Sequence, residues 1–375
     1  MNNYQQQINP LRSWRLGEKN LNWSLTTILL AGLLIAPGYV IAEDSAPAAL
    51  DLDSAITQAL ADNPDLAAQE ALTQAARERA AAAAGRRWPA LGLLGGYQAY
   101  SEDTRLLGAR YNGEPGVFAS DFIEGALTLK LPLYTGGQLT SEIRGTDLLA
   151  QSAEGRLARS RDELIFNVGS LFHTILAQRH VIESVEFSVK AMDEHLKRVN
   201  ELVAAQKAAR VDALRTDVRR AELEQRLIET RNALAIQERA LANLLGLEAQ
   251  PLPQLDGKLE LDEPVICPDA ADCIAAALEQ RTDYRAVQQE ASAAEMARRA
   301  ARGDRLPSVS LSGSYGYRQA VDPAEQPDGT DDAEAIGRVG IVVEFPLFEG
   351  GRLSAKVREA EAILKAARQR ERSLR

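Results

Sequence analysis

The stretch LPLYTGGQL at residues 131–139 returns as FPLFEGGRL at residues 345–353. In both places it ends an alternating apolar run and opens a long run rich in Ala, Leu, Arg and Glu. Proline lacks an N–H donor and is tolerated at a strand end, while paired glycines allow backbone angles that other residues avoid. One copy could be a chance turn, but two copies with matching flanks predict two strand-to-helix corners. The corner residues are Pro132, Gly136, Gly137, Pro346, Gly350 and Gly351.

The similarity between the two halves extends beyond these corners. Aligning the halves pairs Pro89 with Pro307 and Tyr97 with Tyr315. An internal repeat outranks local signals when a fold is assigned, and each unit reads as helix, strand, loop, strand and long helix. We predict a first repeat over residues 43–247, an irregular linker over 248–272 and a second repeat over 273–375.

The amino-acid composition indicates the class of protein. The chain of 375 residues has a net charge of −10 and 5% aromatic residues, which favours long helices. Because basic residues are not in excess, nucleic acid is not a predicted partner.

A basic region precedes the apolar run 25–36, so we predict a secretory signal peptide over residues 1–42. A membrane anchor is the alternative, but the run is shorter than the roughly 20 residues that a spanning helix needs.

Four segments alternate apolar residues with small or polar ones, which is typical of strands with two different faces. Each segment is near the 9–11 residues that a tilted strand needs to cross a bilayer, so we predict one face toward lipid and one toward a wet lumen. The predicted lipid-facing residues are Leu127, Leu129, Val309, Leu311, Ile341 and Val343. The predicted lumen-facing residues are Glu124, Thr128, Lys130, Ser310, Ser312, Arg338 and Glu344. A soluble β-sandwich is the alternative, although it would not place its strands between helices this long.

Four strands are too few for a barrel that holds water, since about eight strands are already filled by side chains. Open sheet edges cannot lie in lipid, because unpaired backbone groups cost several kcal/mol there. We therefore predict that the barrel is shared between chains, with a homotrimer supplying four strands per chain, twelve in all. The loops 102–121 and 319–335, rich in Gly, Pro, Asp and Glu, are predicted at one end of the barrel and the corners at the other.

Two long helical runs follow the first corner. From residue 138 to about 206 there is no proline, and apolar residues step by 3, 4 or 7, which predicts a coiled-coil seam. A break near 207–211 and a second run to about 245 predict an antiparallel hairpin, whose first arm is roughly 100 Å long by helix rise. The lengths suggest that the helix before the first strand meets the return arm end to end. The tip residues are Ala208, Arg210, Val211 and Asp212.

No catalytic, cofactor-binding or metal site is predicted, so an enzyme is not expected. His173, His180 and His195 lack the partner at i, i+4 that a zinc site would need. Cys267 and Cys273 in an exported chain predict a disulfide beside the linker. A redox or metal role for these two cysteines is the alternative.

The doubled corner, the repeat and the hairpin together resemble the TolC-like outer-membrane efflux protein family, over nearly all of the chain from about Leu50. The resemblance implies an α+β membrane protein with four transmembrane strands per chain, a 12-stranded barrel in the trimer and a long periplasmic coiled-coil hairpin. It also implies an outer-membrane exit duct without a cofactor, which works with a periplasmic adaptor (membrane fusion) protein and an inner-membrane pump. The hairpin tip would then be the adaptor-docking site.

The chain departs from that family after its second corner. The first repeat continues to residue 247, whereas the second stops at Arg375, early in its long helix. A second hairpin, where the family's periplasmic gate lies, is expected to be missing, so no gate residues are predicted. We predict passive transport through a duct of a tripartite efflux or type I secretion system in a Gram-negative outer membrane. The alternative is an inactive truncated relative or a periplasmic coiled-coil protein with a structural or interaction role.

Overall fold

The computed structural model describes residues 49–109, 111–247, 252–257 and 269–375. The predicted signal peptide over residues 1–42 lies outside the described residues, as do Cys267 and most of the predicted linker. The predicted domain limits therefore stay predictions.

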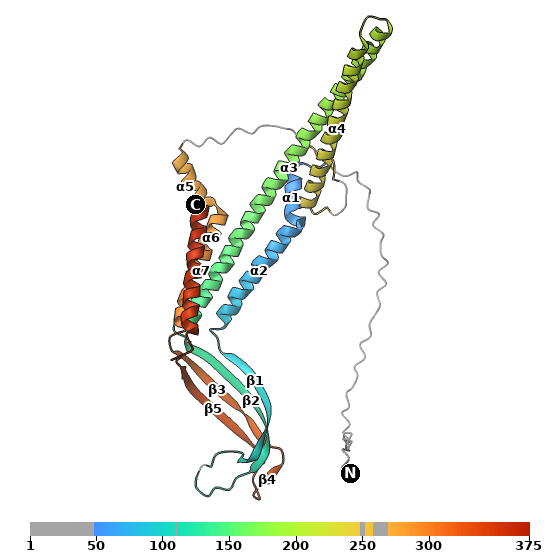
Figure 1. Ribbon diagram of the computed structural model, residues 1–375. Helices are drawn as coiled ribbons and strands as arrows, with labels where there is room; N and C mark the ends of the chain where they lie inside the picture. The colour runs from blue at the N-terminus through green and yellow to red at the C-terminus, as the bar shows by residue number, and fades with distance from the viewer. Residues whose placement is uncertain (1–48, 110, 248–251, 258–268) are drawn as a thin grey trace, which may run out of the picture. The chain divides into compact units, whose positions relative to one another are not determined.

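The helices and strands follow one another in the same order in both halves, apart from α4 and β4 (Figure 1). The first half contains α1 (Leu52–Asp62), α2 (Pro64–Gly85), β1 (Ala90–Arg105), β2 (Phe118–Tyr134), α3 (Gln138–Ala204) and α4 (Arg210–Leu244). The second half contains α5 (Ala270–Gln280), α6 (Thr282–Gly303), β3 (Ser308–Ala320), β4 (Pro323–Glu325), β5 (Ala333–Glu344) and α7 (Arg352–Leu374). The predicted α+β class is confirmed.

A single residue, Asn63, separates α1 from α2. Its side chain caps α2 by accepting a hydrogen bond from the Leu66 amide at 2.9 Å, and Pro64 occupies the first helical position, where its missing N–H costs nothing. The Asn63 amide also donates to the carbonyl of Leu244 at 3.0 Å. The start of α2 therefore meets the end of α4, so the two shorter helices follow each other along α3, as the predicted lengths suggest.

Helix α3 is unbroken over 67 residues and contacts α1, α2, α4 and α6. Two glycines of α3 lie where α6 packs against this helix. A Cβ added at Gly155 would lie 3.1 Å from the Ala286 Cβ, and one at Gly145 would lie 3.4 Å from the Met296 Cβ. These glycines therefore let α6 approach α3 closely, and buried alanines on α6 make the matching surface.

The largest hydrophobic core lies where α1, α3 and α4 meet residues 252–257. Its buried members are Leu50, Ala55, Ala59, Leu66, Leu164, Val168, Phe172, Ile175, Leu176, Leu241, Leu245 and Leu255. Two backbone hydrogen bonds hold the described part of the linker beside α1, from the Leu50 amide to Gln254 at 2.8 Å and from the Asp256 amide to Leu50 at 2.9 Å.

The strands form one antiparallel sheet in the order β1-β2-β3-β5, with β4 paired to β2. The strands β1 and β2 have 16 and 17 residues, more than the alternation in the sequence indicates. The pairing of β1 with β2 continues past an irregularity between Ala99 and Thr104, into the segment predicted as loop 102–121. Likewise, β4 lies within the predicted loop 319–335, so both loops are shorter than predicted.

None of the helices in the described parts of the chain combines the length and the apolar character needed to cross a bilayer.

Candidate channel wall, corners and docking tip

The register of the sheet sorts its side chains onto two faces, because residues opposite each other on paired strands point the same way. Leu127 lies opposite Leu93 and Tyr315. The apolar face comprises Leu91, Leu93, Tyr97, Leu127, Leu129, Val309, Leu311, Tyr315, Val339, Ile341 and Val343. It includes all six residues predicted to face lipid. Leu93 is 86% exposed and Val339 77% exposed, so this chain leaves a large apolar surface uncovered.

The opposite, polar face comprises Gly92, Glu124, Thr128, Lys130, Ser310, Ser312, Ser314, Arg318, Arg338 and Glu344. All seven residues predicted to face the lumen lie on it. The Thr128 hydroxyl donates to the Gly92 carbonyl at 3.1 Å, and the Gln98 amide donates to Glu124 Oε1 at 3.1 Å. Small residues and charges of both signs leave this face wettable, although Leu94 and Val342 interrupt it.

Two strands of the sheet are edge strands. In the described parts of the chain, β1 pairs with β2 alone and β5 with β3 alone. The outer side of each edge strand therefore presents backbone N–H and C=O groups that can pair with another chain.

The two corners place glycines in the left-handed region, with φ of 60° and 78° at Gly136 and Gly137 and of 57° and 85° at Gly350 and Gly351. Gly137 precedes α3 and Gly351 precedes α7. The surroundings of the two corners differ. A Cβ at Gly136 would lie 2.6 Å from the Gly303 carbonyl oxygen, whereas one at Gly350 would meet no atom within 4 Å.

The other two predicted corner residues lie on the strand side of the turns. Pro132 is within β2, opposite Ser310, and Pro346 follows the end of β5. The pairing of β2 with β3 shifts between Pro132 and Tyr134, which fits a proline at the end of a ladder.

A cluster at the loop end of the sheet is absent from the sequence predictions. Leu106, Val117, Ala119, Phe122 and Ala320 bury one another, and the guanidinium of Arg318 stacks 4.1 Å from the centre of the Phe122 ring. Arg318 has the same parity along β3 as the predicted lumen-facing Ser310 and Ser312. That parity is the signal that could have placed it on the polar face.

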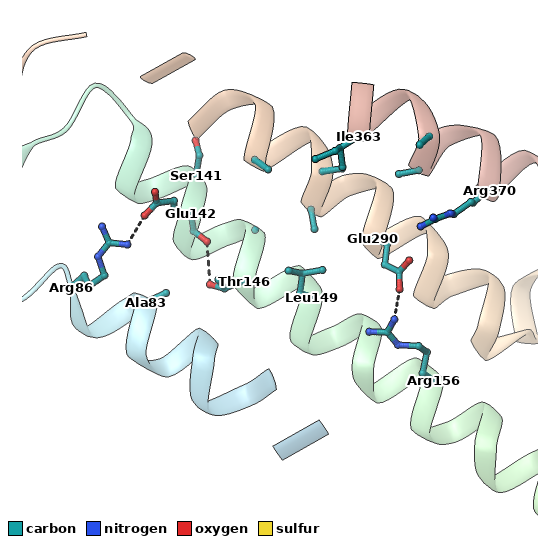
Figure 2. Close-up of a pocket in the computed structure, with 16 residues that line it drawn as sticks. Ala83, Arg86, Ser141, Glu142, Thr146, Leu149, Arg156, Glu290, Ile363 and Arg370 are labelled. Atoms are coloured by element: carbon teal, nitrogen blue, oxygen red, sulfur yellow. Dashed lines mark hydrogen bonds and ion pairs between the residues drawn. The ribbon is translucent and has the colours of Figure 1, made fainter. Parts of the chain in front are cut away.

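A groove of about 780 Å³ lies between α2, α3, α6 and α7 (Figure 2). Arg86, the residue after α2, donates to Glu142 of α3 at 2.5 Å, and Arg156 of α3 donates to Glu290 of α6 at 2.6 Å. None of the predicted site residues lines this groove. Most of its wall on α6 and α7 is made of the small residues Ala293, Ala294, Ala297, Ala366 and Ala367. These contacts tie neighbouring helices together, so the groove is part of the helical wall.

At the hairpin tip the chain turns between Ala204 and Arg210. Gln206 takes a positive φ of 57°, and the Ala209 amide donates to Asp212 Oδ2 at 3.3 Å, which caps the start of α4. The structure places the predicted residue Ala208 in the turn and Arg210, Val211 and Asp212 in the first turn of α4. Leu214 and Val218, which are not among the predicted tip residues, are also exposed.

Below the tip, an ion-pair network joins the two arms of the hairpin. Arg220 of α4 hydrogen-bonds Asp193 of α3 and donates to Glu224 at 2.7 Å. The hydrogen bond to Asp193, with the nearby charge of Glu224, raises the pKa of the Arg220 guanidinium. Beside the network, Leu196, Asn200, Val203, Arg210, Ala213, Leu214 and Asp217 line a groove of about 370 Å³.

The histidines and cysteines give no further site. His173, His180 and His195 all lie in α3. Across the described ranges, no three His, Cys, Asp or Glu side chains form a group that could hold a metal ion. Cys273 lies in α5 and Cys267 lies outside the described residues, so the disulfide stays a prediction.

Several solved structures are similar to this chain in fold. The outer membrane protein VceC from Vibrio cholerae aligns with a TM-score of 0.68 and 20% identity, over 86% of this chain and 75% of VceC. A membrane protein from Pseudomonas aeruginosa aligns with a TM-score of 0.72 and 20% identity, over 86% of this chain and 72% of its own. The outer-membrane channel OprN aligns with a TM-score of 0.67 and 22% identity, over 86% and 70% of the two chains. Identities this low show a shared fold alone.

The family of the chain follows from its sequence. No curated protein matches it. The family model described as outer membrane efflux protein matches residues 55–247 and 273–375, well over half of the chain. This chain belongs to the outer membrane efflux protein family.

Proposed function

We propose that this chain forms the exit duct of a tripartite efflux or type I secretion system in a Gram-negative outer membrane. The observation that carries the proposal is the two-faced sheet. One face exposes leucine, valine and isoleucine, and the other exposes serine, threonine and charged residues. A strand wall with an apolar outer face and a polar inner face is typical of a membrane barrel with a water-filled lumen. Substrates would cross such a lumen passively.

The edge strands support a homotrimer. A sheet edge left open in lipid costs several kcal/mol for each unpaired backbone group. The strands β1 and β5 lie at the two ends of the order β1-β2-β3-β5, so each has one unpaired edge. Pairing β5 of one chain with β1 of the next closes a barrel without edges. Three chains would contribute twelve strands, which is enough for an aqueous lumen because about eight are filled by side chains.

The hairpin supports a periplasmic partner. Helix α3 has 67 residues, which at a rise of 1.5 Å per residue is roughly 100 Å. A helix that long reaches well beyond an outer membrane whose apolar layer is roughly 30 Å thick. The tip around Ala208 and Val211 would therefore meet a periplasmic adaptor protein, which would connect the duct to an inner-membrane pump.

The test is expression of the full chain in a Gram-negative host, followed by membrane fractionation and planar-bilayer recording. We expect the protein in the outer-membrane fraction, a trimer that migrates more slowly on gels before heating than after, and ion conductance without added nucleotide. A monomer recovered from the soluble periplasmic fraction would overturn the proposal and favour a coiled-coil interaction protein. A membrane-inserted trimer that does not conduct would favour an inactive relative.

A further inference from the structure

The two ends of the loop between β1 and β2 pack on the polar face of the sheet. Phe122 and Ala320 lie opposite each other in the register and share that face with Glu124 and Arg318. Leu106 and Val117, at the two ends of the loop, pack on them and are 3% and 5% exposed. The cluster is apolar, although the rest of this face is rich in serine, glycine and charge. It forms a cap at the loop end of the face.

Arg318 holds this cap by several contacts at once. Its Nη1 donates to the carbonyl of Leu106 and its Nη2 to the hydroxyl of Tyr100, each at 3.3 Å. Its guanidinium stacks on the ring of Phe122, with 4.1 Å to the ring centre, a geometry in which a cation is attracted to the face of the ring. Tyr100 packs edge-on against Phe122 and donates to Gln98 Oε1 at 2.6 Å.

The neck of the loop is closed by contacts of its own. The Leu106 amide donates to the Val117 carbonyl at 2.8 Å, and Arg105 Nη2 donates to the Pro115 carbonyl at 2.9 Å. A Cβ at Gly116 would lie 2.5 Å from Arg105 Nε, so Arg105 occupies the space that any other side chain at 116 would need. These contacts join the two ends of the loop, and the hydrogen bond from Arg318 to the Leu106 carbonyl adds a polar link to β3 beside the packing on Ala320.

We propose that Arg318 is a positioning residue that holds this loop over the polar face and so sets the size limit of the outer mouth of the duct. The inference rests on the proposed function, since the loop narrows the lumen where the polar face lines it. The solutes concerned are defined by size and not by charge, because the Arg318 guanidinium is half-buried, donates to Leu106 and Tyr100 and stacks on Phe122. Without Arg318 the loop base leaves the face, and larger solutes pass.

The test compares Arg318→Gln with Arg338→Gln, which removes the same charge from the same face at an exposed position. Each change is made in the full chain, alone and together with Leu106→Cys. The first readout is the rate at which a membrane-impermeant maleimide labels position 106 in whole cells, with the labelled peptide identified by mass. The second is bilayer conductance in the presence of neutral polyethylene glycols of graded size. Arg318→Lys serves as the conservative variant.

For Arg318→Gln we expect labelling about tenfold faster than in the parent, because two hydrogen bonds and a cation–π contact are lost, and passage of larger polymers. Arg338→Gln should leave the labelling rate and the size of the largest polymer that passes as they are in the parent, although the loss of a charge from the proposed lumen changes the ion conductance itself. Arg318→Lys should give a labelling rate and a polymer size limit between those of the parent and Arg318→Gln, since an ammonium keeps the charge but cannot make both hydrogen bonds in that geometry. Equal labelling in the two Gln variants would overturn the inference. If the parent itself does not conduct, the proposed function fails, and labelling still decides whether Arg318 holds the loop.

Discussion

Gly136 and Gly350 make a matched pair at the scale of single residues. Both have φ near 60°, so alanine at either position carries the left-handed penalty of roughly 1–2 kcal/mol. At Gly136 the added Cβ also lies 2.6 Å from the Gly303 carbonyl oxygen and from the Leu306 Cβ. We predict that Gly136→Ala lowers the thermal midpoint more than Gly350→Ala does. Equal shifts would mean that the backbone angle alone accounts for the glycines.

A second pair of glycines separates helix propensity from packing within α3. Alanine is favoured over glycine in a helix interior by about 1 kcal/mol, and Gly169 has room for a Cβ. At Gly155 the Cβ would lie 3.1 Å from both the Ala286 Cβ and the Thr282 carbonyl oxygen. We predict that Gly169→Ala raises the free energy of unfolding by about 1 kcal/mol and that Gly155→Ala does not. Denaturant unfolding of the two variants measures the difference, and an equal gain in both would contradict close packing of α3 on α6.

For these single residues, the sequence predicts the backbone conformation but not the contacts. The positive φ at the four corner glycines follows from two Gly-Gly pairs between strand and helix patterns. The contrast between Gly136 and Gly350 does not, because the neighbour of Gly136 is Gly303, far away along the chain. The contacts of Arg318 and Phe122 could not be predicted for the same reason, because nothing in the sequence indicates that residues 106 and 117 pack against β3.

At the scale of elements, the two faces of the sheet make opposite predictions for adjacent residues of β2. A lysine on a lipid face costs about 2–4 kcal/mol near the bilayer midplane, whereas a lysine facing water costs little. We predict that Leu129→Lys reduces the amount of assembled trimer and that Thr128→Lys does not. Spin labels at the same two positions should report lipid and water, respectively. Loss of trimer in both variants, or equal water exposure of both labels, would contradict the assigned faces.

Glu295 of α6 gives a prediction for pH. Glu295 accepts a hydrogen bond from Arg298 at 2.5 Å and lies 3.7 Å from Arg368 of α7. The hydrogen bond from Arg298, followed by its charge, holds the pKa of Glu295 below its ordinary value of 4.5. A lowered pKa in the folded state means that Glu295 stabilises fully above the unfolded pKa and loses this contribution as pH falls through the folded one.

We therefore expect Glu295→Gln to flatten the acid limb of the stability curve. The measurement is the thermal midpoint of the parent and the variant as the pH is lowered through the ordinary carboxyl pKa of 4.5 and below it. The other carboxylates titrate in both proteins, so the difference between the curves isolates Glu295. Parallel curves would show that Glu295 does not contribute to the acid dependence.

The sequence predicts the bounds of some helices and strands but not of others. The long arm, the return arm and the strands have clear periods of 3.6 and 2, and the bounds of the two helical arms lie close to those predicted. The break at Asn63 is stabilised by a hydrogen bond to Leu244, a contact between segments far apart in the sequence. The added length of β1 and β2 depends on pairing beyond the irregularity at Ala99, which no alternation of residues indicates.

At the scale of the whole molecule, two of the regions where apolar side chains are exposed bear on the proposed function. The sheet exposes Leu93 and Val339, which lipid would cover in the proposed barrel. The tip of the hairpin exposes Val211, Leu214 and Val218, at 48%, 58% and 60%. In the proposed duct, a periplasmic adaptor protein would cover the tip.

The last prediction concerns that tip. If it docks a periplasmic adaptor, a charge at Val211 or Leu214 places an unpaired carboxylate in the contact, and central contacts of an interface cost at least about 2 kcal/mol when lost. We predict that Val211→Glu and Leu214→Glu each reduce adaptor cross-linking from a photoreactive residue at Ala208 by at least about tenfold, and reduce efflux in parallel.

Ile236→Glu is the matched control, because Ile236 is 71% exposed on α4 and lies 22 residues after Leu214, roughly 33 Å along the helix. All three changes are on exposed positions, so the trimer should form in each. Unchanged cross-linking in the two tip variants, or an equal loss in Ile236→Glu, would mean that the adaptor binds elsewhere on the hairpin.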